Sequence, residues 1–119
     1  MGPPTASRDA ELCAAILDPS LIAYLAGARS LGEYRRWLSS DVAMRRVAPR
    51  LAAAGRVIAV FHAENRLAMV EPWLREAGAA GDVPARVIRD KGEDEAIGTM
   101  VAEAASQWLT QRQPQAAPR

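Results

Sequence analysis

Several residue types that carry chemistry are scarce in this sequence. It has one cysteine, Cys13, and so can form neither an intrachain disulfide nor a cysteine-based zinc site. Its one histidine, His62, has no acidic or nucleophilic partner at a catalytic or metal-ligand spacing. The sequence also lacks four common motifs of enzymes and metal sites: a Gly-rich phosphate loop, a CxxC pair, an HExxH motif and a nucleophile elbow. These absences predict a protein that is not an enzyme and that binds no metal and no cofactor.

Long hydrophobic runs are missing as well. No stretch contains enough consecutive apolar residues to cross a membrane. The first residues, "MGPPTASRDAE", do not show the charged and then apolar order of a signal peptide. Because a lone cysteine also fits a reducing compartment, we expect a cytoplasmic protein without a membrane partner.

The distribution of apolar residues predicts the fold class. The chain has 119 residues, of which 50% are hydrophobic, and this is enough for one domain with a core. Apolar residues recur three or four positions apart, and β-branched residues nowhere alternate with polar ones over the length of a strand. The prediction is all-α, a compact multi-helix domain. We divide it into a disordered tail (1–7), a helix-turn-helix region (8–48), a helical core with a C-terminal module (49–112) and a second disordered tail (113–119).

Three short helices are expected in the N-terminal part. The first, Asp9–Leu17, turns Leu12, Ile16 and, as a further candidate, Cys13 inward. The second, Leu21–Ala26, is opened by Pro19 and Ser20 and ends at Gly27, since glycine readily adopts the positive φ found after a helix. The third begins at Leu31.

The start of the third helix has the sequence of a capping box. The Ser30 hydroxyl is expected to accept from the Glu33 amide, and the Glu33 carboxylate from the Ser30 amide. A helix, a turn with glycine and a capped helix make a helix-turn-helix pattern. Tyr34 and Trp37 lie on the side of Leu31 and Leu38 and are expected to pack this helix against the core. In a helix-turn-helix the other side of such a helix enters the major groove of DNA. The candidate DNA-binding residues are Arg29, Ser30, Gly32, Glu33, Arg35 and Arg36.

Charge is distributed unevenly. The net charge is +1, but residues 29–66 hold eight arginines against Glu33, Asp41 and Glu64. Arginine suits phosphates and guanine edges. Arginines also commonly solvate the outer faces of helices, and the sequence leaves both interpretations open.

The middle of the chain predicts two further helices. Residues 38–49 form a connector capped by Ser40 or Asp41, and Pro49 is expected to reset the chain. The longest apolar helix follows, Arg50–His62, with Arg50 and Arg56 outside its buried stripe. That stripe consists of Leu51, Ala54, Val57, Ile58 and Phe61. The next helix, in "ENRLAMVEPWLREAG", bends at Pro72, stops at Gly78 and buries Leu67, Val70, Trp73 and Leu74.

The last third predicts a short helix and a long one. In "DVPARVIRDKG" we expect Asp82 as the cap, Pro84 in the first turn and Gly92 at the end, with Val87 and Ile88 facing inward. The final helix is amphipathic, with apolar positions at Ile97, Met100, Val101, Ala104, Ala105, Trp108 and Leu109. Trp108 fits either the protein's own core or a partner interface. The acidic residues at 90 and 93–95 lack the spacing of a calcium loop and suit the helix dipole.

The order of three segments resembles that of the Xre/MbcA/ParS antitoxins, and the resemblance runs from about Leu17 to Leu109. The segments are "LIAYLAGARSLGEYRRWL", "MVEPWL" and "DVPARVIRDKGEDEAIGTMVAEAASQWL". In that family the N-terminal half binds operator DNA as a dimer or larger assembly. The C-terminal half binds an NAD-consuming toxin of the RES type and blocks its active site. The resemblance therefore implies an antitoxin and autorepressor. Its partners would be a cognate toxin, duplex operator DNA and a second copy of the chain, in a homodimer or a larger hetero-oligomer with toxin.

The same resemblance implies a partner-binding surface in the C-terminal module. It would consist of Pro84, Val87, Ile88, Arg89, Met100, Trp108 and Leu109. The alternative interpretation is a helical protein–protein interaction or dimerisation module that does not bind DNA and whose arginines only solvate its surface.

Overall fold

Helices make up the whole regular structure of the described part of the chain. The computed structural model describes residues 5–76 and 82–112. Their elements are α1 (Thr5–Ile16), α2 (Pro19–Ala26), α3 (Leu31–Leu38), α4 (Asp41–Ala63), the 3₁₀ helix η1 (Leu67–Met69), α5 (Val70–Arg75), α6 (Pro84–Lys91) and α7 (Glu95–Arg112). No strand occurs in these two ranges, and the all-α prediction is confirmed.

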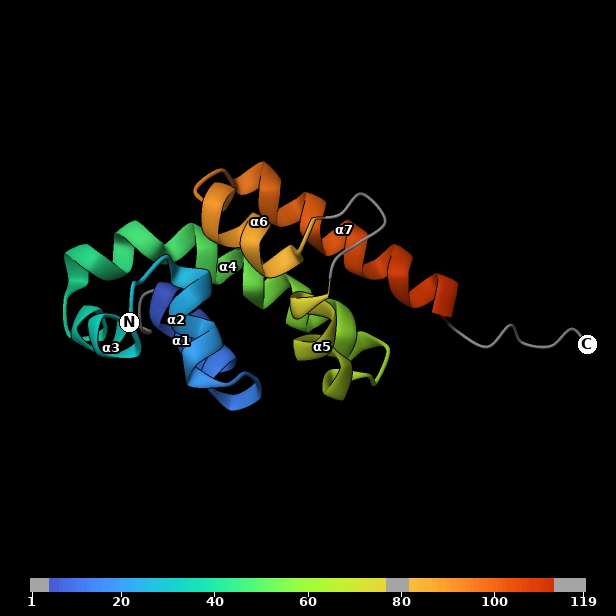
Figure 1. Ribbon diagram of the computed structural model, residues 1–119, viewed down its shortest axis with the longest axis horizontal. Coiled ribbons are helices and arrows are strands. Elements are labelled where there is room, and N and C mark those ends of the chain that lie inside the picture. Colours follow the sequence, from blue (N-terminus) through green and yellow to red (C-terminus); the bar gives the residue numbers. More distant parts are fainter. Residues whose placement is uncertain (1–4, 77–81, 113–119) are drawn as a thin grey trace, which may run out of the picture.

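Helix α4 runs through the middle of the molecule, and the other helices are arranged around it (Figure 1). In this view α7 lies along one side of α4, and α1 and α2 lie on the other. Helix α6 contacts both α2 and α7, while α3 packs on α2 and on α4. The N-terminal and C-terminal thirds of the chain therefore share one central helix.

The buried stripe predicted on α4 is confirmed. All five of its residues are at most 2% exposed: Leu51, Ala54, Val57, Ile58 and Phe61. Small residues beside this stripe allow neighbouring helices to approach closely. A Cβ atom on Gly98 of α7 would lie 3.3 Å from Cβ of Ala53, and one on Gly55 would lie 3.1 Å from Oδ1 of Asp9 in α1. Close packing of α1 and α7 on α4 thus depends on positions without bulky side chains.

Pro49 does not reset the chain, contrary to our prediction. Helix α4 begins after Ser40, whose Oγ accepts a hydrogen bond of 3.2 Å from the Ala43 amide, and continues through Pro49 to Ala63. Proline removes one intrahelical hydrogen bond at this point. Val47 and Leu51, at most 1% exposed, are buried on either side of it, and this burial offsets the loss. The boundary that we drew between residues 48 and 49 lies inside this helix.

Helix α1 differs from the prediction in its start and in its orientation. It begins at Thr5, so residues 5–7 are helical and not part of a tail, while residues 1–4 and 113–119 lie outside the described residues. Its inward face includes Ala10 and Cys13, and Leu17, directly after its end, is buried as well. Leu12 was expected to face inward and is 40% exposed, because the helix packs on α4 around Cys13. Ile16 packs partly against the core.

The local sequence predicted both ends of α2 correctly, but only the C-terminal end of α6. Asp18 caps α2 by accepting from the Ser20 amide at 3.0 Å, and Gly27 ends it with a φ of 91°. The predicted N-cap Asp82 of α6 is wrong. The N-cap is Val83, whose side chain has no hydrogen-bond acceptor, and Pro84 follows at the start of the helix, where its missing N–H leaves one amide fewer without a partner. Gly92 ends α6 as predicted.

The segment around Pro72 is a 3₁₀ turn followed by a short helix. Pro72 lies in the first turn of α5, where proline is tolerated, and no longer helix is bent there. Val70, Trp73 and Leu74 are buried and Leu67 packs partly against the core, as predicted. The predicted stop at Gly78 lies outside the described residues.

Helix α7 buries a narrower stripe than its sequence suggested. Val101, Ala105 and Leu109 are buried, and Ile97 and Trp108 pack partly against the core. Met100 and Ala104 were expected in the apolar face and are exposed, Met100 by 51%. The close contact with α4 covers only the side of α7 that carries Gly98, Val101 and Ala105.

Two general properties follow from the described residues. Their helices include none with both the length and the apolar character needed to cross a membrane. Over the same residues, His, Cys, Asp and Glu side chains form no group of three or more that could hold a metal ion.

The burial of Cys13 and Tyr34 predicts loss of stability at high pH. Burial, and secondarily Asp9, raises the pKa of the Cys13 thiol from its ordinary 9.0 to about 12. Burial, and secondarily Cys13, raises the pKa of Tyr34 from 10.0 to about 12. The unfolded chain therefore releases these protons at a lower pH than the folded chain. Stability should fall by about 1.4 kcal/mol per pH unit for each titrating group, from pH 9 to about 12 for Cys13 and from pH 10 to about 12 for Tyr34.

Urea unfolding at several values of pH from 8 to 11 measures this slope. The variant Cys13→Ala/Tyr34→Phe lacks both groups and should show a much flatter dependence, whatever its stability at pH 8. An equal slope in the variant would mean that other groups cause the alkaline loss of stability.

Candidate functional site

Local capping holds the start of α3. The Ser30 Oγ accepts a hydrogen bond of 3.1 Å from the Glu33 amide, as predicted. The second half of the predicted capping box is different. The Glu33 carboxylate accepts from the Arg29 amide at 2.8 Å and from the Arg29 guanidinium at 3.1 Å, and not from the Ser30 amide. The Glu33 carboxylate bonds to Arg29 and not to the Ser30 amide because Arg29 offers a charged guanidinium donor as well as its amide. Both hydrogen bonds lower the pKa of Glu33.

One side of α3 is fully available to solvent. Gly32, Arg35, Arg36 and Ser39 are all exposed and follow one another at steps of three, one and three residues. This spacing places them on one side of a helix, and we call them the α3 stripe. Tyr34 is buried on the opposite side, whereas Leu38, which was expected to share that buried side, is 47% exposed. Helix α3 thus rests on the core mainly through Tyr34, with Leu31 and Trp37 partly packed.

A Cβ atom on Gly32 would make only ordinary contacts. Its nearest neighbours would be Ser30 Oγ at 3.8 Å and the Arg36 guanidinium at 3.9 Å. Packing within the protein therefore does not require glycine here. The α3 stripe begins with a residue that leaves the helix backbone open to close approach from outside.

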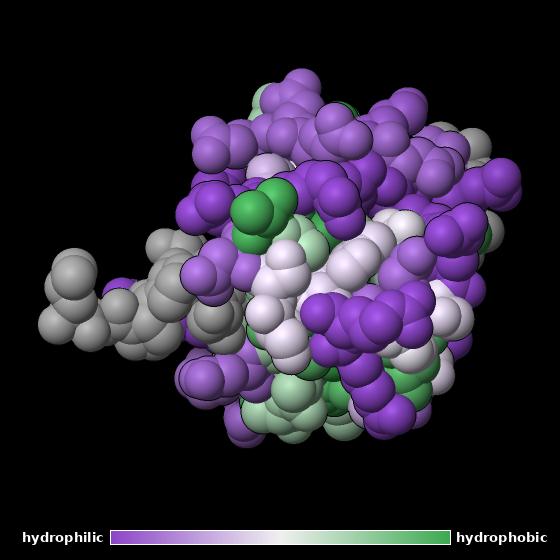
Figure 2. All heavy atoms as spheres, turned by 90° about the vertical axis from the view of Figure 1, so that its left-hand side faces the viewer, coloured by the Kyte–Doolittle hydropathy of each residue, from purple (hydrophilic) through white to green (hydrophobic). Residues whose placement is uncertain are grey.

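Further arginines surround the α3 stripe. The Arg29 side chain is 87% exposed at the entrance of α3, and Arg45 and Arg46 are exposed on the first turns of α4. The Arg46 guanidinium lies 4.9 Å from the centre of the Trp37 ring, a cation–π contact that ties α4 to α3. Figure 2 views the end of the molecule on the left of Figure 1, where α3 and the start of α4 lie. Hydrophilic residues cover most of it, around a smaller pale and hydrophobic area.

The predicted partner-binding residues do not form one exposed surface. Ile88 and Leu109 are 0% and 4% exposed and lie in the core, because each belongs to the inward face of its helix. Pro84, Val87 and Trp108 are half-buried. Met100 is the member of this set with a broadly exposed apolar side chain. A partner that docked here would meet Met100 and the edges of the half-buried residues.

Arg89, the remaining member of that set, makes internal contacts. Its Nη1 donates to the carbonyl oxygens of Tyr24 at 2.8 Å and Ala28 at 2.9 Å. Its guanidinium carbon lies 4.7 Å from the centre of the Tyr24 ring. Arg89 therefore joins α6 to the end of α2 and to the turn that follows.

Arg50 was expected outside the buried stripe and is also used internally. Its side chain is 13% exposed, its Nε donates to the Arg89 carbonyl oxygen at 2.8 Å, and its Nη2 lies 3.2 Å from the Glu93 carboxylate. A Cβ atom on Gly92 would lie 2.9 Å from Cγ of Arg50 and 2.3 Å from the Ile88 carbonyl oxygen, so only glycine fits. Arg56, exposed as predicted, donates to Thr99 Oγ1 at 2.7 Å.

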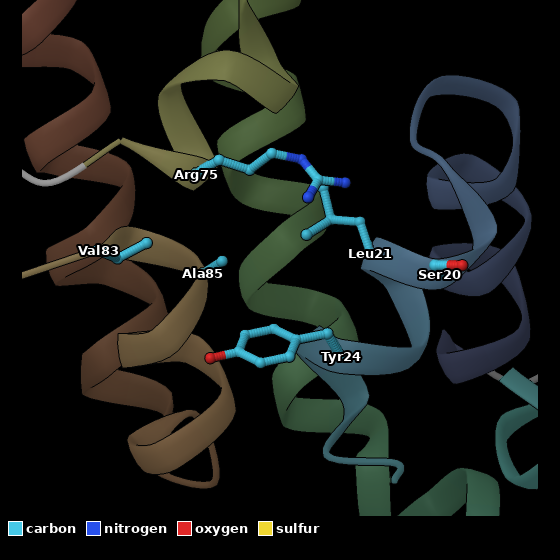
Figure 3. Close-up of a pocket in the computed structure, with 6 residues that line it drawn as sticks. All are labelled: Ser20, Leu21, Tyr24, Arg75, Val83 and Ala85. Atoms are coloured by element: carbon cyan, nitrogen blue, oxygen red, sulfur yellow. The ribbon is translucent and has the colours of Figure 1, made fainter. Parts of the chain in front are cut away.

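Two hollows of the surface are lined mainly by apolar groups. One, of about 410 Å³, lies between α2, α5 and α6, with Arg75 reaching from α5 toward Leu21 and Tyr24 extending from α2 toward α6 (Figure 3). Arg75 is itself paired with Glu71 at 3.7 Å. A second hollow, of about 390 Å³, lies beside α3 and is lined mainly by apolar residues of α1, α2 and α3, with Glu11 and Arg35 among them. His62 is exposed near the end of α4, away from both linings.

No family model matches the chain, and searches among curated proteins and among solved structures found no match either.

Proposed function

We propose that this protein is an antitoxin that binds and inhibits a cognate NAD-consuming toxin of the RES type and represses its own operator as a DNA-binding protein. The resemblance of the sequence to the Xre/MbcA/ParS antitoxins motivates the proposal. The DNA-binding half is supported by one observation above all, the α3 stripe with its two exposed arginines. In this proposal α2, the turn and α3 act as a helix-turn-helix and two copies of the chain occupy one operator.

Two properties of α3 support this proposal: the arginines of its stripe and the short length of the helix. Arginine forms two parallel hydrogen bonds with the major-groove edge of guanine, and Arg35 and Arg36 project from a helix short enough to lie in that groove. Arg29, at the helix entrance, has the position of a phosphate contact. The acidic residue of α3 itself, Glu33, forms an ion pair with Arg29 at 3.1 Å.

Replacing Arg35 and Arg36 with alanine should weaken binding to the protein's own upstream DNA by about 1 to 3 kcal/mol for each base contact that is lost. Arg29→Ala should cause a smaller loss, equal for all sequences. Fluorescence anisotropy with labelled duplex at several salt concentrations measures these losses, and a titration at high DNA concentration gives the number of chains per site. Wild-type affinity should fall steeply with salt, because phosphate contacts release counterions.

Arg66→Ala is the matched control, since Arg66 is also exposed but follows the far end of α4. The control should bind DNA as the wild type does. A wild-type protein that shows no binding at low salt would contradict the DNA-binding half of the proposal.

The second candidate function is a helical interaction module without a DNA role. One specific observation favours it: four of the eight arginines in residues 29–66 have partners within the chain, namely Arg29, Arg46, Arg50 and Arg56. Half of the arginine side chains of this basic region thus have a structural use. Absence of DNA binding together with capture of the toxin would select this function.

A further inference from the structure

We infer that Arg89 is a positioning residue for DNA binding: from α6 it fixes the turn between α2 and α3 and thereby sets the direction of the α3 stripe. This inference rests on the DNA-binding half of the proposed function. It concerns a residue of α6, a helix other than the one that carries the stripe, and one that the sequence assigned to a different role.

A single guanidinium nitrogen bonds to the turn at two points, in addition to the backbone hydrogen bonds of Gly27 and Ala28. Nη1 of Arg89 reaches the carbonyl of Tyr24 in the last turn of α2 and the carbonyl of Ala28 within the turn, at 2.8 and 2.9 Å. Hydrogen bonds from a charged donor are about twice as strong as neutral ones. The Tyr24 ring, 4.7 Å from the guanidinium carbon, fixes the plane of the same group. One planar guanidinium group therefore bridges the two carbonyls.

Arg89 is anchored in its turn by α4. Its own carbonyl oxygen accepts from Nε of Arg50 at 2.8 Å, and Arg50 also holds Glu93, just beyond the end of α6. The absence of a side chain on Gly92 lets the Arg50 stem pass. The end of α6 is thus bonded to the central helix α4, and Arg89 in turn bonds α6 to the turn between α2 and α3.

The direction of α3 depends on this turn. The connection comprises only Gly27 to Ser30, and α3 begins at the next residue. Helix α3 has eight residues, and its one buried residue is Tyr34. A helix with so few buried contacts can tilt about them when its entrance is released. A small tilt would move Arg35 and Arg36 away from base edges, since bidentate contacts tolerate little displacement.

Arg89→Met tests the inference, with Arg86→Met as the matched control. Arg86 lies on the same helix, is 74% exposed and pairs with Asp90, so the control removes the same charge without touching the turn. Arg89→Met should weaken binding to the upstream DNA about tenfold, the equivalent of one base contact, while Arg86→Met should change it little. The slope of log affinity against log salt should be the same in Arg89→Met and the wild type.

Three outcomes of this comparison would overturn the inference. Unchanged affinity in Arg89→Met means that the turn does not need Arg89. A slope reduced by about one means that Arg89 itself contacts a phosphate. Equal losses in the two variants mean a general effect of charge. Arg89→Lys, which keeps the charge and a donor, should recover part of the affinity and serves in place of Arg89→Met if that variant does not fold.

Amide hydrogen exchange separates failure of the inference from failure of the proposed function. The amides of Gly27 and Ala28 donate to carbonyls in the last turn of α2, and the Tyr34 amide donates to the Ser30 carbonyl at the start of α3. They should exchange faster in Arg89→Met than in Arg86→Met, whether or not the protein binds DNA. If the wild type does not bind DNA but these amides respond, the proposed function fails and the structural part of the inference stands. If they do not respond, the inference fails by itself.

Discussion

Replacing Phe61 with alanine should lower the free energy of unfolding by about 3 to 5 kcal/mol, the range for large aromatic residues in a core. Phe61 is 0% exposed. Its ring centre lies 5.8 Å from that of Trp73 on α5 and 6.1 Å from that of Trp108 on α7, both in tilted arrangements that favour aromatic contact. One side chain of α4 therefore connects three helices, and its removal leaves a cavity that none of them can fill alone.

Urea unfolding followed by tryptophan fluorescence measures this loss, since two of the three tryptophans, Trp73 and Trp108, contact the mutated position. Phe61→Leu keeps most of the volume and should cost much less. A loss below about 1 kcal/mol in Phe61→Ala would show that α5 and α7 do not depend on this cluster.

Trp108→Ala should lower the free energy of unfolding by about 3 kcal/mol, near the lower end of the range for a core tryptophan. The sequence left open whether Trp108 belongs to the core or to a partner interface. It contacts Phe61 and packs against the core, yet it keeps part of its surface exposed. The contact with Phe61 favours the first role, and the exposed part limits the expected loss.

Met100→Ala is the companion variant, because Met100 lies on the same helix and is 51% exposed. Its melting temperature should equal that of the wild type. If α7 is the toxin-binding surface, Met100→Ala should weaken protection of cells that express the toxin, whereas Trp108→Ala should lose protection through unfolding. Full protection by a folded Met100→Ala and by a folded Trp108→Ala would remove the toxin-binding role from α7.

Regular periodicity made much of the fold predictable. The five apolar residues of the α4 stripe were assigned correctly because their spacing is unambiguous over three turns. Ser30, Ser40 and Gly27 mark helix ends where expected, since capping depends on the nearest few residues. The exposure of Arg35 and Arg36 follows from the same local reasoning. Their possible contact with DNA stays a prediction.

Contacts between distant residues could not be read from the sequence. Arg50 and Arg89 looked like surface arginines because their acceptors are mostly backbone carbonyls 39 to 65 residues away, and a carbonyl leaves no trace in the sequence. Pro49 looked like a helix break because the burial that compensates it comes from other helices. Leu12 and Met100 had helical spacing, but which side of an amphipathic helix is covered depends on the neighbouring helices.

The continuity of α4 through Pro49 has a consequence for how such a protein can be divided. The α3 stripe lies at one end of this 23-residue helix, and α7 packs along it. A fragment cut at Pro49 would lack helices that cover Val47 or Leu51 in the whole chain, where both are buried. We therefore expect that neither end of the molecule folds when it is separated from the other. Activities carried by its two ends would disappear at the same temperature, in one cooperative transition.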